Sequence, residues 1–94
     1  MTLADLKALP VAVLVFSSRN CGGCAAYLPE FQRVAGKYAR CVPAYVLEVR
    51  DHGALADHYK VAFTPTTIVV RRGRRSSRPL GIPRRRSQIE ALFR

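Results

Sequence analysis

Apolar positions along the chain fall into short runs separated by polar or turn-forming residues. Three runs rich in β-branched residues have the length and composition of strands: Val11 to Phe16, Val42 to Val49 and Thr66 to Val70. The first is apolar almost throughout, which is typical of a strand covered on both faces. Gly73, with two arginines on each side, predicts a hairpin turn, and a fourth strand is expected around Arg78 to Ile82.

A longer periodic segment after the first run predicts an amphipathic helix from Cys21 to Ala39. Its large apolar residues recur every three or four positions and so share one face of the helix: Tyr27, Phe31, Val34 and Tyr38. Pro29 lies inside this segment, where the missing backbone donor and the ring predict a kink.

Three shorter helices complete the pattern. The spacing from Thr2 to Leu9 predicts a short capped helix, and Asp51 can cap another that runs through Tyr59. Ser87 to Glu90 has the form of a capping box that opens the last helix. The order is β-α-β-α-β-β-α after a short N-terminal helix. It predicts an α/β fold, a four-stranded mixed sheet flanked by helices, as a single domain over residues 1–94.

Charge is distributed unevenly along this small domain. The 94 residues carry a formal net charge of +10, and nine of the sixteen Lys and Arg residues fall at Arg71 or later, against one acid there, Glu90. Such a region either forms a solvated surface or attracts acidic proteins or phosphate groups, because arginine presents a planar fork of donors. Both interpretations stay open: a solvated surface, or a binding module that docks an acidic partner or nucleic acid.

Membrane and secretion signals are weak. No apolar stretch approaches the ~20 residues that span a bilayer, and Asp5 stands where a signal peptide has basic residues. Three cysteines, an odd number, do not describe the disulfide framework of a secreted mini-protein. We therefore expect a cytoplasmic monomer that does not bind membranes.

The main candidate for chemistry is the pair Cys21 and Cys24, which follows the first apolar run and opens the long helix. On a helix, a spacing of three residues stacks the two thiols on one side, close enough for a disulfide. Unpaired N–H groups and the positive end of the helix dipole favour Cys21 as a thiolate. Arg19, two residues earlier, acts in the same direction.

With these elements in place, the chain resembles the thioredoxin superfamily from about Val11 to Arg94. The first shared feature is the Cys-Gly-Gly-Cys segment after a strand. The second is Pro29, five residues past Cys24, which resembles the proline that kinks the family's active-site helix. The segment Phe63-Thr64-Pro65-Thr66 precedes a strand and resembles the family's cis-proline turn. Gly81 and the closing helix complete the resemblance.

The resemblance implies a thiol–disulfide oxidoreductase. Cys21 would attack a substrate disulfide and Cys24 would resolve the mixed disulfide, with Gly22 and Gly23 in support. A cis bond before Pro65 would place the turn against the dithiol, where the backbone of Thr64 pairs with an extended substrate segment. The implied partners are disulfide-containing or dithiol proteins and a reductase that recycles the dithiol. No cofactor is expected.

Several positions depart from thioredoxins. Asn20 stands where thioredoxins have Trp, and the residues between the cysteines are Gly-Gly instead of Gly-Pro. Val15 takes the place of the family's buried Asp, so the usual proton acceptor for the second cysteine is missing. Glu30 and Glu48 are substitutes only if they face the site. Direction, rate and substrate therefore do not follow from the resemblance.

A metal site is a rival interpretation. Three cysteines with one histidine could nominally supply four ligands: Cys21, Cys24 and Cys41 with His52 or His58. Structural zinc normally uses two close pairs, and this chain has one pair and scattered single residues, so no metal is expected. We expect Cys41 to begin a buried strand, where a free cysteine packs as a small apolar residue, and the two histidines to lie on a helix surface.

Overall fold

The computed structural model describes residues 1–94. Its elements follow the predicted order: α1 (Leu3–Lys7), β1 (Ala12–Ser17), α2 (Gly22–Lys37), β2 (Ala44–Glu48), α3 (Gly53–His58), β3 (Thr66–Arg71), β4 (Arg74–Arg75) and α4 (Arg86–Leu92). No helix is both long enough and apolar enough to span a lipid bilayer.

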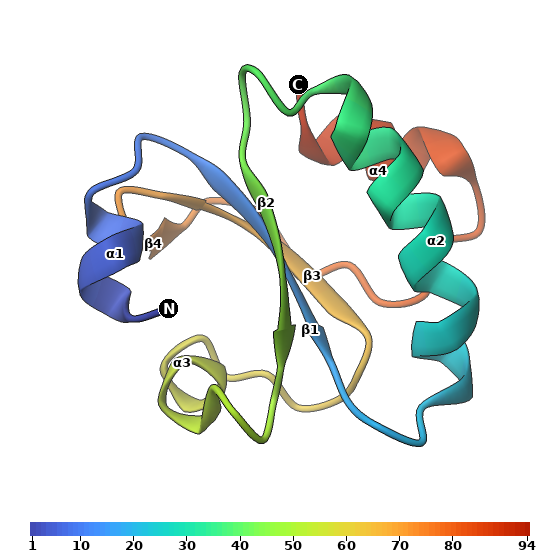
Figure 1. The fold of residues 1–94 in the computed structure, drawn as a ribbon, viewed down its shortest axis with the longest axis horizontal. Helices are drawn as coiled ribbons and strands as arrows, with labels where there is room; N and C mark the ends of the chain where they lie inside the picture. The colour runs from blue at the N-terminus through green and yellow to red at the C-terminus, as the bar shows by residue number, and fades with distance from the viewer.

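The four strands form one mixed sheet with the order β2-β1-β3-β4. β1 pairs in parallel with β2 and antiparallel with β3, and β4 is antiparallel to β3. All six residues of β1 are buried, because helices cover both faces of the sheet: α2 and α4 on one side, α1 and α3 on the other (Figure 1). The nearly continuous apolar run predicted this burial.

Alternation along β1 divides the core into two clusters. Val13 and Val15 face α2 and α4, where they meet Phe31 and other aromatic and aliphatic side chains. Leu14 and Phe16 face α1 and α3. Successive side chains of a strand point to opposite faces, so one strand anchors both helical layers. Its far end, at Ser17, feeds directly into the turn before α2.

The long helix carries the predicted apolar face. Its buried residues are Cys24, Tyr27, Phe31 and Val34. Phe31 packs between Tyr27 and Phe93, with ring centroids 5.7 and 5.9 Å apart, so α4 is held against α2 by aromatic contacts. Pro29 lies inside the helix on its exposed side.

The predicted fourth strand is wrong in its position. β4 consists only of Arg74–Arg75, and within Arg78 to Ile82 a single antiparallel bridge joins Leu80 to Thr67. Pro79 and Pro83 flank Leu80 closely and lack the N–H that a longer ladder needs. The hairpin turn on Gly73 is confirmed, with φ of 81° at this glycine.

Two of the three short helices begin at other residues than predicted. The first is confirmed: the N–H of Asp5 donates to Thr2 Oγ1 at 3.2 Å, and the N–H of Thr2 donates to Asp5 Oδ2 at 2.8 Å. α3, however, starts at Gly53 after His52, one residue beyond Asp51, and no side chain caps it. α4 starts one residue before Ser87.

At α4 the side chain of Gln88 performs the capping. Its Oε1 accepts the backbone N–H groups of Arg84 and Arg85 at 2.6 and 3.1 Å. The start of the helix is therefore fixed by an amide three residues inside it. The arginines of the C-terminal region lie in two different places. Arg86 pairs with Glu30 of α2, whereas Arg71 to Arg75 form the β3–β4 hairpin.

Candidate active site at the Cys21 and Cys24 pair

The thiol pair lies where the chain passes from the central strand into α2. Asn20 has a φ of 59°, a left-handed conformation that asparagine tolerates better than most residues. The reversal places Cys21 as the N-cap of α2. Cys21 and Cys24 form a disulfide with a Cα–Cα distance of 5.2 Å, as the spacing predicted.

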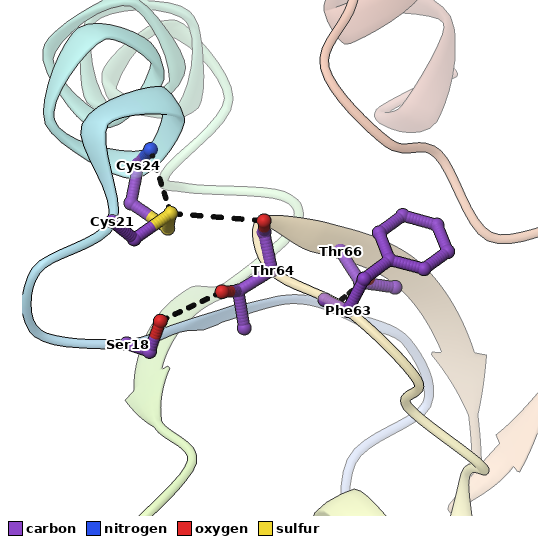
Figure 2. The surroundings of a disulfide bond; sticks show 6 residues. All are labelled: Ser18, Cys21, Cys24, Phe63, Thr64 and Thr66. Carbon is purple, nitrogen blue, oxygen red and sulfur yellow. Dashed lines mark hydrogen bonds between the residues drawn. A yellow bond between two sulfur atoms is a disulfide. The ribbon is translucent and has the colours of Figure 1, made fainter.

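The two sulfur atoms differ in their surroundings. Cys24 is 2% exposed, on the buried face of α2, whereas Cys21 is partly exposed at the end of the helix. The backbone N–H of Cys24 donates to Cys21 Sγ at 3.1 Å (Figure 2). An N–H group at a helix N-terminus favours negative charge on the atom that it faces. Cys21 is therefore the accessible sulfur, and its negative form is the one this backbone stabilises.

The turn before β3 lies directly against the disulfide. The peptide bond between Thr64 and Pro65 is cis, and the carbonyl oxygen of Thr64 lies 3.6 Å from Cys21 Sγ (Figure 2). The hydroxyls of Thr64 and Ser18 are hydrogen bonded at 2.7 Å. This bond joins the turn before α2 to a turn 46 residues later. Ser18 was not among the residues predicted from sequence, because a hydroxyl in a turn carries no local signal for such a distant partner.

An apolar rim borders the thiol pair. Phe63 and Ile82 are 59% and 65% exposed. A Cβ on Gly23 would lie 2.8 Å from Ile82 Cδ1, and one on Gly81 would lie 3.3 Å from Phe63 Cε2. Both apolar side chains therefore pack on glycines and leave most of their surface free. Large exposed apolar side chains beside a reactive group are typical of a surface that binds a partner.

No carboxylate contacts the sulfur atoms. Val15 is fully buried among apolar side chains. Glu48 accepts the backbone N–H of Arg50 at 3.1 Å. Glu30 accepts a hydrogen bond from Arg86 at 2.8 Å, and this bond lowers the pKa of the Glu30 carboxyl below its usual value. Glu30 is therefore held as an ion on the side of α2 that faces α4.

A buried tyrosine, Tyr27, lies one turn further along the helix face that carries Cys24. The hydroxyl of Tyr27 and that of Thr67 are 2.9 Å apart. Burial raises the pKa of Tyr27, and the Thr67 hydrogen bond lowers it by less. Tyr27 thus stays neutral under ordinary conditions and links α2 to β3 beneath the thiol pair.

Cys41 is not buried, contrary to expectation. It is a free, exposed thiol in the turn between α2 and β2, because β2 starts at Ala44, two residues later than the predicted run. Nor do Cys41, His52 and His58 join the thiol pair: no three His, Cys, Asp or Glu side chains lie close enough to hold a metal ion. Arg19 is exposed in the turn before Cys21.

Comparison with known proteins agrees with this geometry. The family model described as Thioredoxin matches residues 4–94. Thioredoxin H2-2 from Oryza sativa subsp. japonica is 32% identical over 69 residues, which are 73% of this chain and 51% of that protein. The chain thus spans about half the length of this curated relative.

Solved thioredoxins share the fold at low sequence identity. A mutant thioredoxin from Halobacterium salinarum NRC-1 superposes with a TM-score of 0.80 at 21% identity, covering 97% of this chain and 79% of that one. The oxidised thioredoxin from Plasmodium falciparum gives 0.80 at 16% identity, covering 97% and 85%. Since the family model covers nearly the whole chain, the protein belongs to the thioredoxin family.

Proposed function

We propose that this protein is a thiol–disulfide oxidoreductase in which Cys21 is the nucleophile and Cys24 the resolving thiol. The observation that carries the proposal is the Cys21–Cys24 disulfide at the start of α2, with the N–H of Cys24 directed at Cys21 Sγ. Accessibility supports the division of roles, because a substrate disulfide can approach Cys21 but not the buried Cys24.

The reaction needs only the two cysteines and a substrate disulfide. The thiolate of Cys21 attacks one substrate sulfur, the substrate S–S bond breaks, and the released thiolate takes up a proton. Cys24 then loses its proton and attacks Cys21 Sγ in the mixed disulfide, which releases the second substrate sulfur as a thiol. Two electrons pass from the dithiol to the substrate. The reverse sequence oxidises a substrate dithiol.

The Thr64–Pro65 turn is the proposed binding site for the substrate backbone. The Thr64 carbonyl lies beside Cys21 Sγ, so its peptide group is positioned to pair with an extended segment that carries the reacting sulfur. Phe63 and Ile82 provide exposed apolar surface close to this turn. Because each turnover leaves the protein in one oxidation state, a second partner, such as a reductase, must restore the other.

Turnover of a protein disulfide in the presence of a small dithiol tests this proposal. Cys21→Ser and Cys24→Ser should each reduce the rate to that of the small dithiol alone. Cys41→Ser is the matched control, since Cys41 is an exposed thiol outside the site, and it should leave the rate unchanged. Full turnover by Cys21→Ser, or loss of turnover in Cys41→Ser, would contradict the assignment.

A further inference from the structure

A strongly cationic cleft lies away from the thiol pair, between α1, the end of α3 and the β3–β4 hairpin. It has a volume of about 790 Å³, and only one of its ten lining residues is hydrophobic. Six of the others are basic: Lys7, Lys60, Arg71, Arg72, Arg74 and Arg75. In Figure 1 these elements occupy the left of the molecule, whereas α2, which carries the thiols, lies on the right.

The walls of the cleft are fastened together by buried contacts. The hydroxyl of Tyr59, at the end of α3, donates to the carbonyl oxygen of Gly73 at 2.6 Å. Gly73 is buried, and a Cβ there would lie 2.8 Å from Lys7 Cγ, so α1 packs directly on the hairpin tip. The cations are therefore carried by a rigid frame and do not depend on a flexible loop for their proximity.

No acidic side chain neutralises these six cations. The three ion pairs of the protein all use Glu30 or Glu90, on α2 and α4. In the cleft, the guanidinium of Arg72 donates to the carbonyl oxygen of Ala8 at 3.2 Å, which is a neutral partner. Like charges held this close repel one another, and an anion in the cleft would offset that repulsion.

Two of the cations occupy backbone positions that favour other residues. Arg72 (φ 51°) and Gly73 (φ 81°) form a two-residue hairpin loop in which both φ values are positive, a conformation for which Asn-Gly is the preferred pair. Lys60 has a φ of 56° at the end of α3. There its N–H donates to Asp57 O and that of Val61 to Ala56 O, the pattern in which glycine is usual.

A left-handed conformation is unfavourable for a residue with a Cβ, because the Cβ comes too close to the following carbonyl oxygen. The chain accepts this cost at Lys60 and again at Arg72, and both line the same cleft. At Lys60 the charge forms no ion pair, and at Arg72 the guanidinium donates only to the neutral carbonyl oxygen of Ala8, so neither charge is neutralised within the fold. Their placement indicates that the charge itself has a use.

We infer that this cleft binds the phosphate backbone of nucleic acid without sequence selectivity. Guanidinium groups match phosphate oxygens with paired donors. The near absence of apolar lining disfavours an acidic peptide, whose recognition normally adds apolar pockets for its side chains. Tyr59 is buried and His58 is the one exposed aromatic ring in the cleft, so base stacking is limited to a single imidazole and most contacts fall on the backbone.

The binding is independent of the proposed redox chemistry. β3 has Thr66 at its start, next to Pro65, and Arg71 at its end, so the two sites lie about 17 Å apart along the strand. A Cys21→Ser protein should bind nucleic acid as the unaltered chain does. A failure to bind nucleic acid would therefore not affect the proposed redox function, and a failure of the redox function would not affect the proposed binding.

Fluorescence anisotropy with a labelled mixed-sequence oligonucleotide of about 20 nucleotides tests the inference, in salt from about 50 mM upwards. Arg71→Gln with Arg74→Gln should weaken binding by roughly tenfold or more, and should reduce the log–log salt slope by about 1.4, from two lost phosphate contacts. Arg40→Gln with Arg50→Gln is the matched control. Both of its arginines are exposed outside the cleft, and it removes the same charge.

Two backbone variants keep the test free of folding artefacts. Lys60→Gly and Arg72→Asn introduce the residues that the local conformation favours, so each should keep or raise the thermal midpoint while weakening binding. Equal losses in the cleft variant and the control would overturn the inference. So would unchanged binding in both backbone variants, or tighter binding of an oligoglutamate peptide of the same charge.

Discussion

The side chain of Ile82 occupies the space into which a side chain on Gly23 would project. A Cβ on Gly23 would lie 2.8 Å from Ile82 Cδ1 and 3.5 Å from Pro65 Cδ. The second glycine between the cysteines is thus matched to a large residue that follows Gly81. Gly23, where thioredoxins have Pro, therefore leaves the room that Ile82 fills, whereas a side chain on Gly22 would meet nothing within 4 Å.

Gly23→Ala should therefore depend on the residue at position 82. In an Ile82→Ala background the alanine has room, and a helical position then gains up to about 1 kcal/mol of stability over glycine. In the unaltered chain the gain should shrink or reverse, because Ile82 must move. Denaturant unfolding of the oxidised single and double variants gives the coupling energy. Equal effects of Gly23→Ala in both backgrounds would show that the two residues do not compete.

Tyr27 should make the protein sensitive to alkaline pH. Burial raises the pKa of its hydroxyl in the folded state, so the unfolded chain releases this proton first as pH rises. The associated stability is complete below the usual tyrosine value of about 10 and is lost as pH rises through the folded value.

Tyr27→Phe tests this relationship. Near neutral pH it should destabilise the fold by about 1–3 kcal/mol, because the buried Thr67 hydroxyl loses its partner. Above pH ~10 its stability should fall less steeply than that of the unaltered chain. Urea unfolding at a series of pH values measures both effects. Parallel pH profiles for the two proteins would contradict this account.

Arg86 should control the titration of Glu30. Its hydrogen bond is the main cause of the lowered pKa of that carboxyl. Because the folded pKa is depressed, this pair stabilises the fold above the unfolded glutamate pKa, and the stabilisation is lost as pH falls through the folded value. Arg86→Gln should return the Glu30 pKa towards its usual value, measured by carboxyl NMR titration. Arg33→Gln should shift it less, since Arg33 lies 3.6 Å away. The reverse order would be inconsistent with the contacts described.

The sequence predicted elements whose signal is local. The apolar stripe of α2 and the continuous apolar run of β1 are patterns that burial imposes on neighbouring residues. The structure confirmed both elements. The exposed position of Cys41 was not predicted, because β2 starts three residues after it and is an edge strand in which only Leu47 is buried. Pro79 and Pro83 are local evidence against a strand from Arg78 to Ile82, because neither has an N–H to donate.

The residues of the site that the sequence did not predict are brought there by tertiary contacts. Ser18 contacts Thr64, and Ile82 contacts Gly23, in each case across a long stretch of chain. Neither a serine nor an isoleucine has a sequence signal that identifies such a distant partner. The cationic cleft was hidden for another reason. Lys60 belongs to a different segment from the arginines. Its backbone is left-handed, a conformation that lysine rarely adopts and that its sequence therefore does not predict.

The role of Cys21 as the attacking thiol is tested most directly by trapping. Cys24→Ser, reduced and then mixed with a protein disulfide, should accumulate a mixed disulfide, because the resolving thiol is absent. Mass analysis of the digested adduct should place the substrate peptide on Cys21. An adduct on Cys41 would contradict the account, as would a stable adduct formed by Cys21→Ser through Cys24 while Cys24→Ser forms none.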